Sequence, residues 1–267
     1  MKNKLYIVEG LPCSGKSTIG RYVAELIQGK YVDEGTGNHP ADYEFQSFIS
    51  YDEYNEISLE NKEKMKSHLK EKYNGYVVEL SHLTEEKELF DYLLQHKIYD
   101  FLPWNVEKKV MLDKWQEFAE NSNKEIYVFN CVLLQNPMCE TMMRFGFDDS
   151  VSFEYISEIV NILKDYEIIV IYLKNDSIRE SVEKAVPERG EEWLNAVIDY
   201  HVNGKYGQEH KLEGFDGYIK ALQERQKREL RILEKLSLNS IVLDNPQKDW
   251  DSAKKLLREK LINESRN

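Results

Sequence analysis

Short continuous apolar runs alternate along the chain with longer segments of helical periodicity. Five short runs predict strands, over Lys4–Gly10, Lys30–Glu34, Glu125–Cys131, Glu167–Leu173 and Ser240–Leu243. The run EIIVIYL in the fourth segment is apolar throughout, which is typical of a parallel strand covered on both faces. The pattern therefore predicts a sheet at the centre of the protein.

The segments between these runs predict helices over Ser17–Ile27, Ser177–Asp199, Gly217–Leu236 and Trp250–Leu261. Strands that alternate with helices indicate a parallel sheet with helices on both faces. We therefore expect one α/β domain over residues 1–267, a three-layer αβα sandwich with a five-stranded parallel sheet.

About ninety residues separate the second and third predicted strands, far more than one crossover needs. This stretch, 42–121, is predicted to be mostly helical, and its segment EISLENKEKMKSHLKEKY has the pattern of a solvated helix face. Residues inserted here must build something above the sheet. We expect a helical substrate-binding cap.

Composition and charge narrow the class of protein. The 267 residues are 41% hydrophobic and 31% charged, and no apolar run approaches the ~20 residues of a membrane helix. The apolar stretch near the N-terminus is too short for a signal peptide, so we expect a cytoplasmic protein with no membrane partner. Its three cysteines are typical of free thiols. A net charge of −12 disfavours binding to nucleic acid.

The segment GLPCSGKST follows the first predicted strand and opens the first predicted helix. It matches G-x-x-x-x-G-K-[ST], whose backbone N–H groups surround a phosphate at a helix N-terminus. Lys16 is expected to reach the β- and γ-phosphates of ATP, Ser17 to bind Mg²⁺, and Thr18 to contact the α-phosphate. The predicted nucleotide-binding residues are Gly10, Leu11, Pro12, Cys13, Ser14, Gly15, Lys16, Ser17 and Thr18.

Two features extend this motif. Glu9 precedes Gly10, and the fourth strand is followed by a helix with Lys184 and the run Arg189-Gly-Glu-Glu. Together with the loop, they resemble the deoxynucleoside kinases and thymidylate kinases. The resemblance implies a lid over 177–215, with Arg189 closing over the phosphates. It does not extend through residues 42–121.

The same resemblance implies a carboxylate at the end of the second strand that takes the proton of the accepting hydroxyl. Glu34 is our first choice for this general base, and Asp33 the second. The third strand departs from the family, because Asn130 stands where an acidic residue normally helps to hold Mg²⁺. Asn is a weaker magnesium ligand than a carboxylate. Three alternatives stay open: Glu9, Asp33 or Glu34 supplies the missing charge, the metal is held mostly by water and phosphate, or the activity is lost or altered.

The acceptor site is less clearly marked. The loop GTGNHPADYE contains His39, Asp42 and Tyr43, which are expected to face the acceptor with Asp33. Gln135 and Arg144, after the third strand, are further candidates, as are Trp104 and Trp115, because a flat ligand needs an amide and an aromatic wall. The basic residues of Gly217–Leu236 are read as a solvated face with i,i+4 pairs; they are Arg225, Lys227, Arg228 and Arg231.

The leading interpretation is a kinase that moves the γ-phosphoryl group of ATP-Mg²⁺ to a nucleoside or nucleotide. A sugar or antibiotic hydroxyl is an alternative acceptor, and a homodimer is left open. A nucleotide-binding switch or ATPase is the other class. The motif that binds guanine in GTP-binding switches is matched only superficially by the segment Leu173-Lys174-Asn175-Asp176. An ATPase usually has a carboxylate at the end of the third strand to polarise water, and Asn130 lacks it.

Overall fold

The computed structural model describes residues 3–122 and 125–264, with side chains through residue 261. The chain divides into two units. The core unit comprises Met1–Asp33 and Ser122–Asn267, and the inserted unit comprises Glu34–Asn121. The inserted unit thus begins at Glu34, the last residue of the second predicted strand. Each unit is described separately below.

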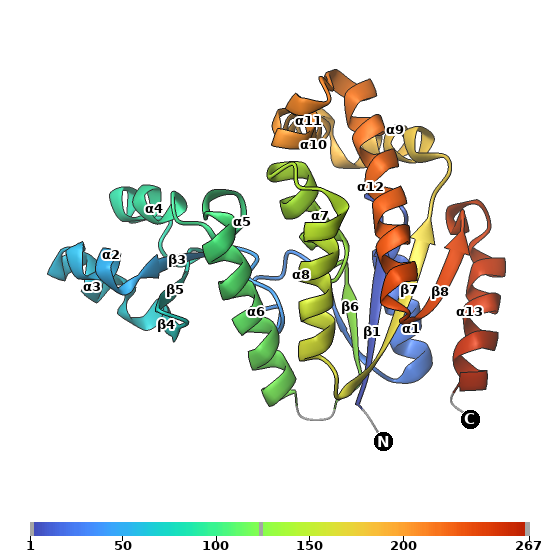
Figure 1. Ribbon diagram of the computed structural model, residues 1–267, viewed down its shortest axis with the longest axis horizontal. Coiled ribbons are helices and arrows are strands. Elements are labelled where there is room, and N and C mark those ends of the chain that lie inside the picture. The colour runs from blue at the N-terminus through green and yellow to red at the C-terminus, as the bar shows by residue number, and fades with distance from the viewer. Residues whose placement is uncertain (1–2, 123–124, 265–267) are drawn as a thin grey trace. The chain divides into compact units, whose positions relative to one another are not determined.

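The core unit is built on a five-stranded sheet in the order β2-β6-β1-β7-β8 (Figure 1). Every pairing in it is parallel, which confirms the predicted sheet. The strands are β1 (Asn3–Gly10), β2 (Lys30–Val32), β6 (Tyr127–Asn130), β7 (Tyr166–Lys174) and β8 (Asn239–Asp244). All five run the same way, so their carboxyl ends meet at one edge, where open parallel sheets bind ligands.

Alternation along β1 divides its side chains between the two faces of the sheet. Tyr6 and Val8 pack in a core with residues of α1 (Lys16–Ile27) and α13 (Trp250–Glu264). The opposite face is covered by α8 (Asp149–Ile162) and α12 (Gly214–Leu236), where Tyr172 of β7 hydrogen-bonds Glu229 of α12. The core unit therefore has the three predicted layers.

Several elements of the core unit differ from the sequence prediction. The predicted helix Ser177–Asp199 is broken at Gly190, whose φ of 88° cannot continue a helix. Helix α8 was not predicted, although Asp148 caps its N-terminus through the N–H groups of Ser150 and Val151. The remaining helices of the unit are α7 (Gln135–Met138), η2 (Cys139–Arg144), α9 (Ile178–Arg189), α10 (Glu191–Asn203), α11 (Lys205–Glu209) and η3 (Pro246–Lys248).

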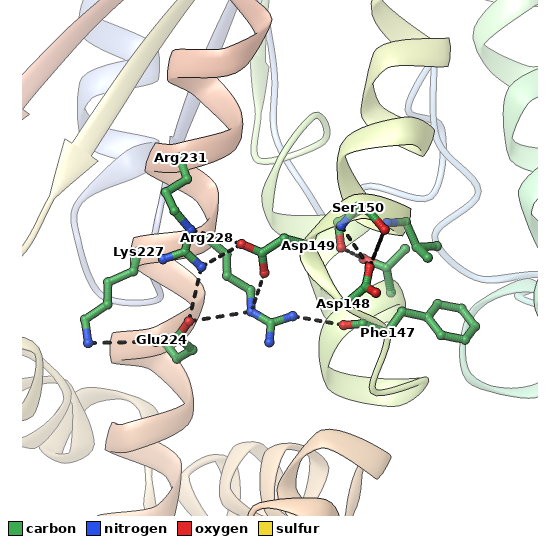
Figure 2. Close-up of polar contacts among 11 residues, drawn as sticks. Phe147, Asp148, Asp149, Ser150, Glu224, Lys227, Arg228 and Arg231 are labelled. Carbon is green, nitrogen blue, oxygen red and sulfur yellow. Dashed lines mark hydrogen bonds and ion pairs between the residues drawn. The ribbon is translucent and has the colours of Figure 1, made fainter.

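Helix α12 is joined to the start of α8 by ion pairs, which Figure 2 shows. Arg231 Nη2 lies 2.7 Å from Asp149 Oδ2, and Arg228 Nε lies 3.0 Å from Asp149 Oδ1. Arg228 also donates to the carbonyl of Phe147 at 2.9 Å. The predicted solvated face was therefore wrong for Arg228, and it was wrong for Arg225, which is fully buried, because neighbouring elements cover this part of α12.

The inserted unit contains a three-stranded antiparallel sheet in the order β3-β5-β4, which corrects the prediction of a mostly helical segment. Its strands are β3 (Gln46–Ser50), β4 (Leu69–Lys72) and β5 (Gly75–Glu79). Its helices are α2 (Tyr51–Glu56), α3 (Leu59–Met65), η1 (Lys66–His68), α4 (Lys87–Leu94), α5 (Ile98–Phe101) and α6 (Trp104–Asn121).

A short turn between β4 and β5 marks this sheet, although the helical periodicity of the charged run before it predicted a helix. Lys72 pairs with Gly75, so Tyr73 and Asn74 form a two-residue hairpin turn between β4 and β5. Tyr73 has a φ of 52°, in the left-handed region that such turns require. The charged run before it was predicted to be helical, but α3 ends at Met65 and β4 begins at Leu69. The hairpin is held by a core that it shares with α3 and α4; its buried members are Ile49, Met65, Val78, Leu80, Leu83, Leu89 and Leu93.

Candidate active site at the P-loop

The glycine-rich loop lies between β1 and α1, as predicted. Gly10 has a φ of 143°, and a Cβ built there would lie 2.7 Å from the carbonyl oxygen of Leu173. Gly15, at the N-cap of α1, has a φ of 90°. Both positions therefore require glycine. The turn that they permit sends the chain from a buried strand straight into a helix N-terminus.

The N-terminus of α1 has the properties of an anion site. It has no side-chain cap and no acidic residue in its first turn, so no carboxylate competes for its N–H groups. Lys16 is 7% exposed, and its ammonium donates to the carbonyl of Leu11 across the loop at 3.0 Å. The helix dipole and the lysine thus place positive charge at the same loop.

Packing on both flanks of the loop fixes its position. Leu11 is buried in a core with side chains of α9 and α12, among them Val182 and Leu222. On the other flank the indole of Trp250 lies against Gly15, where a Cβ would come within 2.2 Å of its Cη2 atom. The role of Trp250 was missed in the sequence analysis, because nothing in a helix-starting Trp indicates a partner more than 200 residues away.

Three polar side chains meet beside the first turn of α1. Asn130 Nδ2 donates to Asp33 Oδ1 at 2.7 Å and lies 3.4 Å from Ser17 Oγ. Ser17 Oγ itself lies 3.4 Å from Asp33 Oδ1. Asp33 follows β2 and Asn130 ends β6, two neighbouring strands. The structure thus brings together Ser17, Asp33 and Asn130, and it does so at the loop that holds Lys16.

The sequence left open that Glu9 supplies negative charge to a magnesium ion, but its carboxylate binds backbone N–H groups instead. Its carboxylate accepts three backbone N–H groups of the chain after β6: those of Leu133 and Leu134 at 2.8 Å, and that of Gln135 at 3.1 Å. The side chain is fully buried, and this burial raises the pKa of Glu9 to about 7 against the lowering effect of the three hydrogen bonds. Glu9 therefore supports the loop after β6.

Arg189 ends α9 and stacks on Trp193, with its guanidinium carbon 4.9 Å from the ring centroid. It also lies near enough to the P-loop to affect Cys13. Burial raises the pKa of the Cys13 thiol, while the positive charges of Arg189 and Lys16 oppose the rise. The exposed Arg189 thus belongs to the electrostatic surroundings of the loop, and its role in a lid stays a prediction.

Behind the loop lies a buried ionic network between the sheet and α12. Arg225 Nε lies 3.0 Å from Glu229 Oε1, with both side chains at most 1% exposed. Tyr172 donates to Glu229 Oε2 at 2.6 Å, and Arg225 Nη1 donates to Cys139 Sγ at 3.4 Å. An opposite charge, together with hydrogen bonds from neighbouring groups, is what allows such charges to stay buried.

The other candidates of the core unit are Gln135 and Arg144. The backbone N–H of Gln135 is held by Glu9, so this residue has a defined position at the start of α7. Arg144, in η2, pairs with the buried Glu140 at 2.8 Å and stacks on Phe145. Part of its charge is therefore engaged within its own helix. A role of either residue in acceptor binding stays a prediction.

Glu34, His39 and Asp42 lie in the inserted unit. Glu34 is exposed, whereas His39 and Asp42 are buried. Asp42 Oδ1 accepts from the backbone of Tyr43 and from the hydroxyl of Tyr99, and His39 Nδ1 accepts from the N–H of Ala41. Burial, and secondarily the charge of Lys114, lowers the pKa of His39 to about 3, so this imidazole is neutral at pH 7.

These contacts give His39 and Asp42 structural roles within their loop, and their predicted contact with the acceptor stays a prediction. Trp115 lies in the core of the inserted unit, where it meets Phe118 edge to face. Its predicted role as an acceptor wall is not favoured by this burial. Trp104 begins α6 and is partly exposed.

Two searches of the described residues gave negative results. Side chains of His, Cys, Asp and Glu nowhere gather in groups of three or more that would bind a metal ion. No described helix combines the length and apolar character needed to span a membrane. A magnesium ion bound with nucleotide needs only one or two protein ligands besides phosphate and water.

Comparison with known proteins gave structural similarities alone. Neither a family model nor a curated protein matches the sequence. The chain is similar over nearly its whole length to solved structures of P-loop kinases. A deoxyadenosine kinase from M. mycoides with bound dATP is 16% identical at a TM-score of 0.44, covering 97% of this chain and 99% of that one.

Two further structures show how broad this similarity is. A thymidylate kinase from Candida albicans is 11% identical at a TM-score of 0.48, with 99% and 93% coverage. A shikimate kinase from Aquifex aeolicus is 11% identical at a TM-score of 0.38, with 98% of each chain covered. At such identities and TM-scores, these similarities carry no conclusion about substrate or mechanism.

Proposed function

We propose that the protein is an ATP-dependent phosphotransferase whose acceptor is a small molecule. The observation that carries this proposal is the junction of β1, the glycine-rich loop and α1, with Lys16 lying across the loop. Its two strained glycines and its uncapped helix N-terminus are suited to bind the phosphates of a nucleotide. The five-stranded parallel sheet places this loop at the edge where ligands bind.

In this proposal the residues act mainly by position and charge. Backbone N–H groups of residues 10–18 and the Lys16 ammonium hold the phosphates and offset the charge that develops during transfer. Ser17 is the protein ligand of Mg²⁺, which supplies further positive charge to the phosphate oxygens. Glu34 is kept as the general base for a hydroxyl acceptor.

A nucleoside or nucleotide is the preferred acceptor, because the Glu-Gly entry to the loop and the Arg189 segment resemble those of the deoxynucleoside and thymidylate kinases. A sugar or antibiotic hydroxyl is the alternative. A cytoplasmic location, a homodimer and the exclusion of nucleic acid stay predictions from composition. They have no bearing on the site.

The proposal predicts that nucleosides or nucleotides will stabilise the protein in the presence of a non-hydrolysable ATP analogue with Mg²⁺. A ligand at 100 times its Kd adds about 2.7 kcal/mol to the free energy of unfolding. The melting temperature is measured over a panel of nucleosides, nucleotides, sugars and aminoglycosides, and each stabilising compound is then assayed with γ-labelled ATP. Stabilisation by ATP analogue without label transfer to any compound would contradict a kinase.

Arg189→Ala is expected to lower turnover by about tenfold to a hundredfold, while the affinity for ATP falls much less. Charge-assisted hydrogen bonds of an arginine are worth about 1.5–3 kcal/mol, and a lid contact is strongest in the transition state. Steady-state kinetics with varied ATP measure both quantities. Arg179→Ala is the matched control, since Arg179 of the same helix pairs with Asp216 and stacks on Phe215. Equal losses in both variants, or a loss confined to ATP affinity, would contradict the lid role.

A guanine-specific switch is not favoured by the contacts of the segment after β7. The side chain of Asn175 donates to Ser181 and accepts from the backbone of Ser177, both within 2.9 Å. Asp176 accepts from Asn245 at 2.9 Å. These side chains join two loops of the core unit and are engaged in that structural task.

A further inference from the structure

Asn130 is a buried amide at the end of a strand, where it has an oxygen atom without a hydrogen-bond partner. Its side chain is 0% exposed, and while Nδ2 donates to Asp33 and lies near Ser17, Oδ1 has no partner. A buried polar atom without a partner is costly, and proteins retain one where it has another use. The other end of the amide, Nδ2, faces Ser17 and Asp33 beside the loop that is proposed to bind nucleotide.

We propose that Asp33 supplies the carboxylate of the metal–nucleotide site and that Asn130 is its positioning residue. The resemblance implies an acid at the end of β6, where this chain has Asn130. In this proposal the acid is instead Asp33, after the neighbouring strand β2, and Asn130 holds Asp33 next to Ser17. This inference rests on the proposed function, since it names the acid that serves the same site. Ser17 Oγ and Asp33 Oδ1, which lie 3.4 Å apart, are hard oxygen donors of the kind that magnesium prefers.

The contacts of Asp33 fix its carboxylate in this orientation. Arg21, on the exposed side of α1, holds Oδ2 at 3.1 Å. The other oxygen, Oδ1, is thereby left on the side of Ser17 and Asn130, at 3.4 Å and 2.7 Å. The Asp33 side chain is 23% exposed, so it is partly screened from water and still accessible to ligand.

Two other acids were open from the sequence. Glu9 is fully buried and bound to three backbone N–H groups, which leaves it no role at the metal. Glu34 follows Asp33 in the chain but belongs to the inserted unit, and its side chain is exposed. Asp33 is the acid whose described hydrogen bonds join it to Ser17 and Asn130.

Electrostatics also explains why position 130 carries an amide and not a carboxylate. A carboxylate there would stand about where Asn130 Nδ2 now lies, 2.7 Å from Asp33 Oδ1. Two carboxylates at such a distance would repel each other. An amide instead donates a hydrogen bond to Asp33 Oδ1 and adds no second negative charge.

The test is the affinity of Mn²⁺ for the complex with ADP, measured by electron paramagnetic resonance of the free ion. Asp33→Asn is expected to weaken Mn²⁺ binding by about 10- to 100-fold, the usual effect of losing a metal ligand or its support. ADP affinity in EDTA should stay unchanged, because the phosphate-binding loop is intact. Glu34→Gln is the matched control, and it should leave Mn²⁺ affinity unchanged even where it lowers turnover.

The decisive variant exchanges the pair, Asp33→Asn with Asn130→Asp. It keeps one amide, one carboxylate and the hydrogen bond between them, and it should recover most of the Mn²⁺ affinity lost in Asp33→Asn. Normal Mn²⁺ affinity in Asp33→Asn, a loss in Glu34→Gln instead, or no recovery in the exchanged pair would each overturn the inference. If the wild-type protein fails to bind ADP in EDTA, the proposed function itself is overturned. That result can be told apart from the three above, because they concern Mn²⁺ affinity in variants that still bind ADP.

Discussion

Replacing Lys16 with alanine is expected to lower the rate of phosphoryl transfer by about 10²- to 10³-fold, the effect of removing one positioned donor from developing charge. The ammonium is 7% exposed and is held over the loop by the carbonyl of Leu11, so it is already placed before nucleotide binds. ATP affinity should also fall, by roughly 10- to 100-fold, because a charge-assisted hydrogen bond is worth about 1.5–3 kcal/mol.

Single-turnover transfer and calorimetric ATP binding measure the two effects. Lys30→Ala is the matched control, since Lys30 is 62% exposed, pairs with Glu125 at 3.8 Å and lies over the ring of Tyr127. This control should change neither quantity. The melting temperature of Lys16→Ala should stay close to that of the wild type, because one hydrogen bond within a loop is lost. If ATP affinity and the rate of phosphoryl transfer are both unchanged in Lys16→Ala, the proposal that this loop binds the nucleotide is contradicted.

Replacing Glu229 with alanine is expected to lower the free energy of unfolding by about 3–5 kcal/mol. Glu229 is 0% exposed and holds both Arg225 and Tyr172, so its loss leaves a buried guanidinium without a counter-charge. This cost is a large part of the total stability of a typical domain, about 5–15 kcal/mol. The core unit should therefore melt at a much lower temperature.

Denaturant unfolding followed by circular dichroism measures this effect. Lys227→Ala is the control on the same helix, since Lys227 is 67% exposed and lies 3.8 Å from Glu224 (Figure 2). An exposed pair of this kind contributes about 0–1 kcal/mol. The double change Arg225→Met with Glu229→Leu should be far less harmful than Glu229→Ala, because it removes both charges. Equal losses in the single and double variants would show that packing, and not the charge, sets the cost.

Local patterns sufficed for the parts of the protein that are built from neighbouring residues. The apolar run of β7 and the alternation of strands and helices predicted the parallel sheet, because a strand buried on both faces must be apolar throughout. The loop between β1 and α1 was equally predictable. The backbone of this loop turns at Gly10 and Gly15, and the spacing of these two glycines in the sequence is enough to predict that turn. The motif, between a strand and a helix, therefore identifies the loop that contains Lys16.

The parts that depend on distant residues were not accessible in this way. Asn130 read alone as a weaker substitute for an acid, and Asp33 as an alternative base. A hydrogen bond joins them, since β2 and β6 are neighbours in the sheet although 94 residues lie between Val32 and Tyr127. In the same way, the charges of Arg225 and Glu229 have the spacing of a solvated i,i+4 pair.

Burial decided between these meanings. A helix face that is charged in sequence is solvated only where no other element covers it, and α12 is covered by β7 and α8. The secondary structure of the inserted unit shows the same dependence, because a charged run of helical composition pairs as β4 where Tyr73 and Asn74 close a hairpin with the apolar β5. Periodicity reports local preference, whereas partner, charge state and exposure are properties of contacts between segments far apart in the chain.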